Sequence, residues 1–143
     1  MSKQQTIILE KLYSAELKKY LSSMDLNSVL VFGSLITDNF NEASDVDIAI
    51  LSNNKLKLKD ILDLELYLEN ILNRTIDVID LNSETLDIFI KKDILNNGKV
   101  IYSQDSNKTL EKLIDDLDWY FKENETFFYF RRRDLLSWMK KDY

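Results

Sequence analysis

The alternation of apolar and polar positions predicts helices and strands along most of the chain. Apolar residues between Gln4 and Ser22 recur at spacings of three and four, which is typical of one amphipathic helix. The same spacing over Leu58–Leu72, with a wider apolar face, predicts a helix packed on a sheet. Shorter apolar runs, rich in β-branched residues, predict strands at Ser28–Phe32, Asp45–Leu51, Thr75–Leu81 and Lys99–Ser103, the last a candidate edge strand. We therefore expect an α/β (α+β) fold, with helices packed on a small mixed sheet.

Capping and turn residues indicate where the remaining elements begin and end. A short helical turn is expected at Leu35–Phe40, directly after Ser34. Ser83 is a good N-cap for a helix over Glu84–Asn96, and Gly98 stands where a C-cap glycine is expected. These signals place a helix between the third and fourth strands.

Residues 104–143 form a predicted helical segment at the C-terminus. A polar turn at Gln104–Lys108 precedes a helix that begins at Thr109 and is expected to break around Lys122–Glu125. Beyond the break, apolar residues lie beside Arg131, and aromatic residues next to arginine are enriched at protein interfaces. We hypothesise that this last helix docks a partner or a second copy of the chain through Phe127, Phe128, Phe130, Leu135, Trp138 and Met139.

Length and composition describe one domain over residues 1–143. The chain is 45% hydrophobic and 31% charged, as in a globular protein with a real core. The longest uncharged stretch, Leu26–Thr37, is shorter than the roughly 20 residues that span a bilayer, and the N-terminus lacks a signal-peptide pattern. We therefore expect a cytoplasmic protein with no membrane association.

The chain contains no Cys and no His. Disulfides, thiolate ligands, histidine bases and Ser-His-Asp triads are thereby excluded, so any catalysis must depend on carboxylates and metal. The net charge of −6 argues against direct nucleic-acid binding. Residues 126–143 carry five basic and two acidic side chains, a net +3 that leaves −9 for the rest and suggests a docking surface.

Asp45 and Asp47 form the first candidate for chemistry. Alternation along a strand places their side chains on one face, while Val46, Ile48 and Ile50 share the other. Two neighbouring carboxylates repel each other unless a cation lies between them. Hard oxygen ligands of this kind suit Mg2+ or Mn2+, with water and phosphate completing the coordination.

Gly33 and Ser34 follow the first predicted strand and form the second candidate. The whole chain has only two glycines, Gly33 and Gly98. Gly33 permits a backbone conformation that a side chain would obstruct, and Ser34 offers a hydroxyl and an N–H where a short helix begins. This turn is therefore a candidate phosphate-binding site.

The third predicted strand offers two further carboxylates, Asp77 and Asp80. Because they are three residues apart they point to opposite faces, so only one can join Asp45 and Asp47. Asp77 lies amid apolar residues, whereas Asp80 is close to the strand end, where a capping role is available.

The order and spacing of these residues resemble the signature of the nucleotidyltransferase superfamily that includes DNA polymerase β. Ten residues separate Ser34 from Asp45, and Ser44, Asp45, Val46 and Asp47 follow the superfamily pattern. Within the superfamily the spacing is similar to that of minimal nucleotidyltransferases (MNT proteins), in particular the antitoxins paired with HEPN ribonuclease toxins. The resemblance continues through RTIDVIDLN and ILNNGKVIY, at residues 74–82 and 94–102.

This resemblance implies a nucleotidyltransferase fold and a metal-dependent transfer of AMP from ATP to a hydroxyl. Asp45, Asp47 and Asp77 would be the catalytic and metal-binding carboxylates for two Mg2+ ions. Gly33, Ser34 and Ser44 would contribute to nucleotide binding. The acceptor implied is a tyrosine of a cognate HEPN toxin, which adenylylation would inactivate.

Three alternatives remain at this level: an antitoxin that acts by binding alone, an enzyme that modifies RNA or a small molecule such as an aminoglycoside, and a domain with no active site. Many relatives carry a small or basic residue or a second glycine soon after the Gly-Ser pair, whereas this chain has Leu35, Ile36, Thr37 and Asp38. The cation that meets the triphosphate is also open, with candidates Arg74, Lys91, Lys92 and Lys99.

Overall fold

The computed structural model describes residues 2–131, which fall into two compact units that meet between Leu110 and Glu111. The first unit contains α1 (Lys3–Leu12), α2 (Ala15–Ser22), β1 (Leu26–Phe32), the 3-10 helix η1 (Gly33–Ile36), β2 (Val46–Ser52), α3 (Leu58–Leu72), β3 (Ile76–Asp80), α4 (Ile88–Asn97) and β4 (Lys99–Ser103). Helix α5 (Lys108–Glu123) runs on into the second unit.

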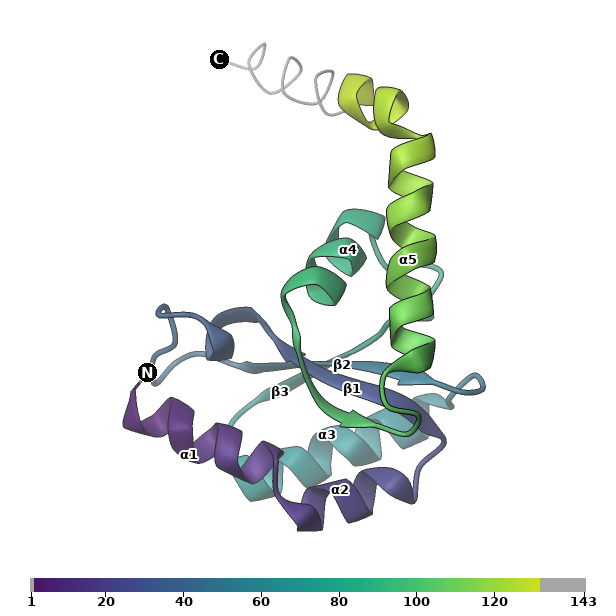
Figure 1. The fold of residues 1–143 in the computed structure, drawn as a ribbon. Helices are drawn as coiled ribbons and strands as arrows, with labels where there is room; N and C mark the ends of the chain where they lie inside the picture. Colours follow the sequence, from purple (N-terminus) through teal and green to yellow (C-terminus); the bar gives the residue numbers. More distant parts are fainter. Residues whose placement is uncertain (1, 132–143) are drawn as a thin grey trace. The chain divides into compact units, whose positions relative to one another are not determined.

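The strands of the first unit form one mixed sheet in the order β3-β2-β1-β4 (Figure 1). β1 pairs antiparallel with both β2 and β4, while β2 and β3 run parallel. β4 is therefore an edge strand, as the sequence predicts. The small mixed sheet with packed helices confirms the predicted fold class.

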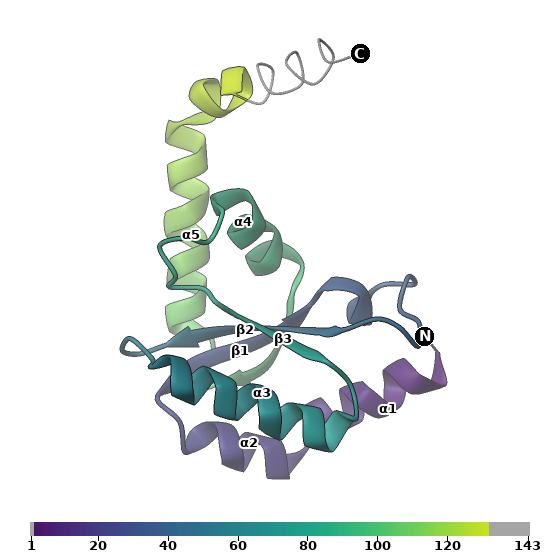
Figure 2. The ribbon, with the colours of Figure 1, turned by 180° about the vertical axis from the view of Figure 1, so that it is seen from behind.

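Helices α1, α2 and α3 cover one face of this sheet, and α4 lies over the other (Figures 1 and 2). The main core lies under the first three helices. Alternate strand residues such as Val31 and Ile48, which are fully buried, meet Leu12, Leu64 and Leu68 there. Each large apolar side chain buried in this way contributes about 1.5–3 kcal/mol to folding. The opposite face of β2 is thereby left for polar residues near its beginning.

The predicted single helix over Gln4–Ser22 is wrong, because the chain breaks into α1 and α2 at residues 13–14. The Ser14 side chain accepts a hydrogen bond from the Leu17 N–H (3.2 Å) and so caps α2. Apolar residues recur at helical spacing on both sides of the break, which conceals it in the sequence. The two helices can then each follow the curvature of the sheet.

The helix predicted at Glu84–Asn96 begins later, at Ile88. Asp87, rather than Ser83, is its N-cap and accepts hydrogen bonds from the N–H groups of Phe89 and Ile90. Ser83 instead belongs to the turn that follows β3. Gly98 is the C-cap, as predicted, but its backbone is extended (φ −67°) rather than left-handed. A side chain there would bring a Cβ to 2.6 Å from the Ile94 carbonyl oxygen.

Other predicted boundaries agree closely with the structure. The bounds of α3 and β4 match the prediction, and Asn73 ends α3 in a left-handed conformation (φ 53°). The helical turn expected at Leu35–Phe40 begins earlier, as η1. The predicted break around Lys122–Glu125 is a turn at residue 124, after which residues 125–131 are helical.

The second unit, described up to residue 131, is rich in aromatic contacts. Phe128 lies 4.8 Å from Phe121 and 5.8 Å from Tyr120, measured between ring centroids. The hypothesised docking residues Leu135, Trp138 and Met139 lie outside the described residues. Within residues 2–131, no helix is both long and apolar enough to cross a membrane.

Candidate active site

The strand register brings Asp47 and Asp77 together. Asp47 of β2 is the direct partner of Asp77 on the parallel strand β3, and on its other side it pairs with Phe32 of β1. Residues paired directly on neighbouring strands share a face of the sheet. The neighbouring residue, Ile48, belongs to the core beneath α1–α3, so both aspartates lie on the opposite face.

Asp45 completes a set of three carboxylates at this end of the sheet. It precedes β2 by one residue and is exposed, as is Asp77, whereas Asp47 is half-buried. Burial, followed by the negative charges of Asp77 and Asp45, raises the pKa of Asp47 above its ordinary value. The negative charges of Asp77 and Asp45 therefore act on Asp47, and a bound cation would offset this repulsion.

Asp80 has a different position. It is the partner of Ile50, a core residue, and its carboxylate accepts a hydrogen bond from the Asn82 N–H (2.9 Å) in the turn after β3. Of the two candidates on β3, the structure thus places Asp77 beside Asp47. Asp80 stabilises the turn.

Gly33 lies directly against Asp47. Its φ of +75° is a conformation that L side chains rarely adopt. A Cβ on Gly33 would overlap the Asp47 carboxylate and lie 3.1 Å from its Cγ. Glycine is therefore required at this position by both backbone geometry and the closeness of the Asp47 side chain.

Ser34 is the second residue of η1. Its carbonyl oxygen accepts hydrogen bonds from both the N–H and the hydroxyl of Thr37, each at 3.0 Å. The part of the chain that the structure describes offers its own hydroxyl no hydrogen-bond partner. That hydroxyl can therefore donate to a ligand oxygen.

Ser44 holds the turn that leads into β2. Its hydroxyl accepts a hydrogen bond from the Asn41 N–H (3.0 Å), and its own N–H donates to the Asn41 carbonyl (3.1 Å). Its carbonyl accepts from Arg74 (2.9 Å). Ser44 thus shapes the approach to Asp45, and its hydroxyl proton stays available for a ligand.

The candidate cations are placed differently from one another. The Arg74 guanidinium is already bound to backbone carbonyls of the loop before Asp45. Lys99 pairs with Val31, a core residue under α1–α3, and so lies on the face away from Asp47. Lys91 and Lys92 belong to α4, on the same face as the three carboxylates.

Gln5 contributes to the site in a way that sequence reasoning missed. This buried side chain donates hydrogen bonds to the carbonyls of Leu35 (3.0 Å) and Thr37 (2.6 Å), which fixes η1 against α1. The available signal was the pattern Ser2-x-x-Gln5, because Ser2 and Gln5 form a capping box at the start of α1. That pattern predicts a helix start and says nothing of a long-range contact.

A hollow of about 540 Å3 lies beside the site, between α1 and the loop before β2. Ser44 and Asp45 form part of its wall, and other lining residues include Gln4, Lys11, Glu42 and Arg74. The mixture of charged and amide groups makes this hollow polar.

The donor set fits a magnesium ion. No group of three acidic side chains within residues 2–131 lies close enough to enclose a metal by itself. However, Mg2+ usually takes one or two carboxylates and completes its shell with water and phosphate oxygens. The paired Asp47 and Asp77, with Asp45 beside them on an accessible surface, suit that mode of binding.

Comparison with solved structures shows the same fold. A chain in the crystal structure of a toxin–antitoxin with AMP-PNP has a TM-score of 0.69 and 20% identity, covering 86% of this chain and 99% of that one. A chain from the tri-AMPylated Shewanella oneidensis HEPN toxin in complex with MNT antitoxin has a TM-score of 0.56 and 21% identity, with coverage of 83% and 95%. A chain from an MntA–HpeT toxin–antitoxin mutant has a TM-score of 0.67 and 17% identity, covering 85% of this chain and 96% of that one.

The comparison with curated proteins found no match. The family model for the polymerase beta nucleotidyltransferase domain matches residues 15–107, a span that contains the Gly-Ser turn and all three carboxylates. Because that span is well over half of the 143 residues, the chain belongs to the polymerase beta nucleotidyltransferase family.

Proposed function

We propose that this protein transfers AMP from ATP to a hydroxyl group, and that the acceptor is a tyrosine of a HEPN ribonuclease toxin for which it is the antitoxin. Membership of the nucleotidyltransferase family supports the reaction class. The observation that carries the proposal is the register that sets Asp47 beside Asp77, with Gly33 against Asp47. An intact carboxylate site of this kind favours catalysis over inhibition by contact alone.

Asp45, Asp47 and Asp77 would bind the divalent metal. Bound Mg2+, expected as two ions, would offset the charge of the triphosphate and lower the pKa of the acceptor hydroxyl. The raised pKa of Asp47 means that a neighbouring cation would stabilise the ionised form of this carboxylate. With no histidine in the chain, carboxylates must carry out the work that an imidazole performs elsewhere.

In the transfer step the acceptor hydroxyl would pass its proton to a carboxylate of the site, and its oxygen would attack the α-phosphorus of ATP. A new oxygen–phosphorus bond forms as the bond from the α-phosphorus to the bridging oxygen breaks, and pyrophosphate leaves with that electron pair. The hydroxyl of Ser34 would donate to a phosphate oxygen, and Gly33 keeps the space beside Asp47 clear. Ser44 holds the turn before Asp45.

The choice of acceptor is supported by the structures to which the fold is similar. They include complexes of toxins with antitoxins, one of them with AMP-PNP and another with a tri-AMPylated HEPN toxin. A tyrosine hydroxyl on a protein partner would require a docking surface. We assign that surface to the second unit, whose exposed aromatic side chains within residues 111–131 are Trp119, Tyr120, Phe127, Tyr129 and Phe130.

The test is mass spectrometry of the HEPN protein encoded beside this chain after incubation with the chain, ATP and Mg2+. A gain of one AMP mass per modified tyrosine is expected, and the Asp45→Asn, Asp47→Asn variant should give none. A matched control is Glu10→Gln with Asp63→Asn, which removes two exposed acidic charges from α1 and α3. That control should transfer AMP at the wild-type rate.

Other outcomes would redirect the proposal. Tight binding of the HEPN protein without added mass would indicate an antitoxin that acts by contact. Neither binding nor added mass, combined with turnover of ATP in the presence of an aminoglycoside or another small hydroxyl compound, would indicate a small-molecule acceptor.

A further inference from the structure

The side chain of Arg74 binds several backbone carbonyls of the loop before Asp45. Its Nη1 donates hydrogen bonds to the carbonyl oxygens of Asn41 (2.8 Å), Glu42 (3.3 Å) and Ser44 (2.9 Å). Its Nη2 donates to Oε1 of Gln4 on α1 (2.9 Å). The guanidinium therefore ties the loop to the first turn of α1.

Phe40 fixes the other side of the guanidinium. The Arg74 Cζ lies 4.4 Å from the centroid of the Phe40 ring, in the range of a cation–π contact, and Phe40 is only 8% exposed. The ring is part of the core, so it supplies a rigid surface beside the guanidinium. Arg74 is thus positioned by its contact with the Phe40 ring and by its hydrogen bonds to backbone carbonyls.

These contacts matter because Asp45 lies outside the hydrogen-bonded sheet. β2 begins at Val46, whose N–H donates to the Thr75 carbonyl (2.9 Å), and Asp45 is the residue before it. The backbone on the N-terminal side of Asp45 is exposed from residue 41 to residue 43. Its position therefore depends on the local turn at Asn41–Ser44 and on Arg74.

The arrangement requires arginine in particular. A guanidinium presents several N–H donors in a fixed plane, whereas a lysine ammonium is a compact charge on a flexible stem and cannot occupy the same fork of carbonyls. A residue that simply neutralised phosphate could be either arginine or lysine. The direction of the Arg74 donors, toward backbone oxygens of the loop, separates these two roles.

We propose that Arg74 is a positioning residue of the active site, which holds the 41–44 loop so that Asp45 stands ready beside Asp47 to share a divalent cation. The inference rests on the proposed function for its catalytic consequence. The bracing of the loop itself can be tested without any turnover.

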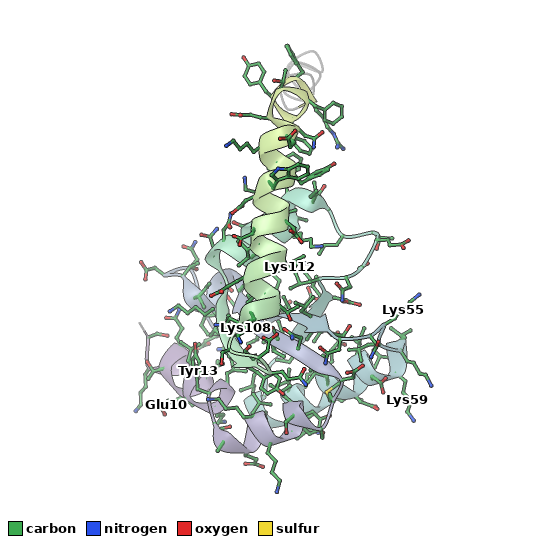
Figure 3. The ribbon with its side chains drawn as sticks, turned by 45° about the vertical axis from the view of Figure 1, so that its right-hand side comes forward. Glu10, Tyr13, Lys55, Lys59, Lys108 and Lys112 are labelled. Atoms are coloured by element: carbon green, nitrogen blue, oxygen red, sulfur yellow. The ribbon has the colours of Figure 1, made fainter. Side chains whose placement is uncertain are left out.

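The experiment compares Arg74→Lys and Arg74→Gln with the wild-type protein. Lys59→Gln is the control, because Lys59 is exposed and points outward from the first turn of α3 (Figure 3). Amide hydrogen exchange of the peptide covering residues 40–46 should become about tenfold faster in both Arg74 variants, with β1 and α3 unchanged. Binding of Mn2+ in the presence of a non-hydrolysable ATP analogue, followed by electron paramagnetic resonance, should weaken by about tenfold.

Kinetics distinguish a positioning residue from a residue that contacts the phosphates, because the two roles affect kcat and KM differently. With a HEPN acceptor, kcat should fall by about tenfold or more in both variants, while the KM for ATP changes by less than about threefold. Should Arg74→Lys behave as wild type while Arg74→Gln raises only the KM for ATP, Arg74 is a triphosphate contact and the proposal is overturned. Unchanged exchange at residues 40–46 in both variants overturns it as well.

Two further results keep the tests separate. If the wild-type protein transfers no AMP, the proposed function fails, yet hydrogen exchange and Mn2+ binding still decide the role of Arg74. If neither Arg74 variant folds, Gln4→Met removes only the bond to Nη2 and should speed exchange of the same peptide about threefold. An exchange rate in Gln4→Met equal to that of the wild type would then count against the brace.

Discussion

Asp77 is the direct neighbour of Asp47 across the only parallel strand pair of the described sheet, and both lie on the face opposite α1–α3. Parallel pairing makes this possible, because it aligns the beginnings of β2 and β3 at one end of the sheet. The polar face there remains accessible, while the apolar residues that alternate with the aspartates along the two strands face the core. That alignment brings together the carboxylates that we propose bind a divalent cation.

Replacing Asp77 with Asn should lower the rate of AMP transfer by on the order of a hundredfold or more, because one of the charged oxygen ligands is lost. Asp80→Asn is the matched control. Asp80 bonds to the Asn82 N–H in a turn, so its replacement should leave the transfer rate within about threefold of the wild type. Equal losses in both variants would contradict the assignment of Asp77. Initial rates with saturating ATP and Mg2+ provide the measurement.

In the metal-free protein, the contribution of Asp47 to stability should fall as the pH rises through the folded-state pKa of this residue. Burial and the charges of Asp77 and Asp45 raise that pKa. A group with a raised folded pKa contributes most below its unfolded pKa, and this contribution is lost as it ionises in the folded state. In EDTA, the Tm of Asp47→Asn minus that of the wild type should therefore increase with pH. Added Mg2+ should reverse this rise in the Tm difference. A Tm difference that does not change with pH would count against repulsion among the three carboxylates.

Gly33→Ala should damage both stability and activity. The left-handed backbone costs a non-glycine residue about 1–2 kcal/mol, and the new Cβ must displace the Asp47 carboxylate. Gly98→Ala provides the comparison, because its Cβ would meet the Ile94 carbonyl, far along the chain from the carboxylates. Both variants should melt at lower temperature. Only Gly33→Ala should lose activity per folded molecule, measured well below the melting temperature.

Gln5→Met should destabilise the protein by about 1–3 kcal/mol. The change keeps the side-chain volume but removes the donor from the buried carbonyl of Leu35 and from the partly buried bond to the Thr37 carbonyl. Gln4→Met, at an exposed position on the same turn of α1, should have a smaller effect. Urea denaturation of the two variants would measure the difference, and equal free energies of unfolding would contradict it.

Phe127→Ala and Phe130→Ala should each weaken binding of the HEPN partner by about tenfold or more, since exposed aromatic side chains are the usual anchors of an interface. Lys122→Ala, an exposed residue of α5, serves as the control and should change the affinity little. Isothermal titration calorimetry gives both constants. Unaltered affinity in the two phenylalanine variants would place the docking surface elsewhere on the chain.

Much of the secondary structure could be predicted because it depends on local patterns. Helical spacing over Leu58–Leu72 and the β-branched run before Leu81 identify their elements without any partner. Predictions failed where a short polar side chain competes with the helix for backbone hydrogen bonds. Ser14 interrupts what looks like one helix by capping α2. Asp87 rather than Ser83 caps α4, because both serine and aspartate can serve as the N-cap of a helix.

By itself, the sequence determined which chemistry is available: carboxylates without histidine or cysteine, a Gly-Ser turn, and the pairing of Asp45 with Asp47 on one strand face. It left Asp77 and Asp80 as alternatives, and Arg74 as one cation among several. Only the tertiary structure showed that Asp77 is the one beside Asp47 and that Arg74 binds the 41–44 loop. The register of two parallel strands and the hydrogen bonds of a loop depend on residues distant in the chain. Periodicity reports the face on which a side chain lies, whereas its neighbour on that face is set by how the strands align.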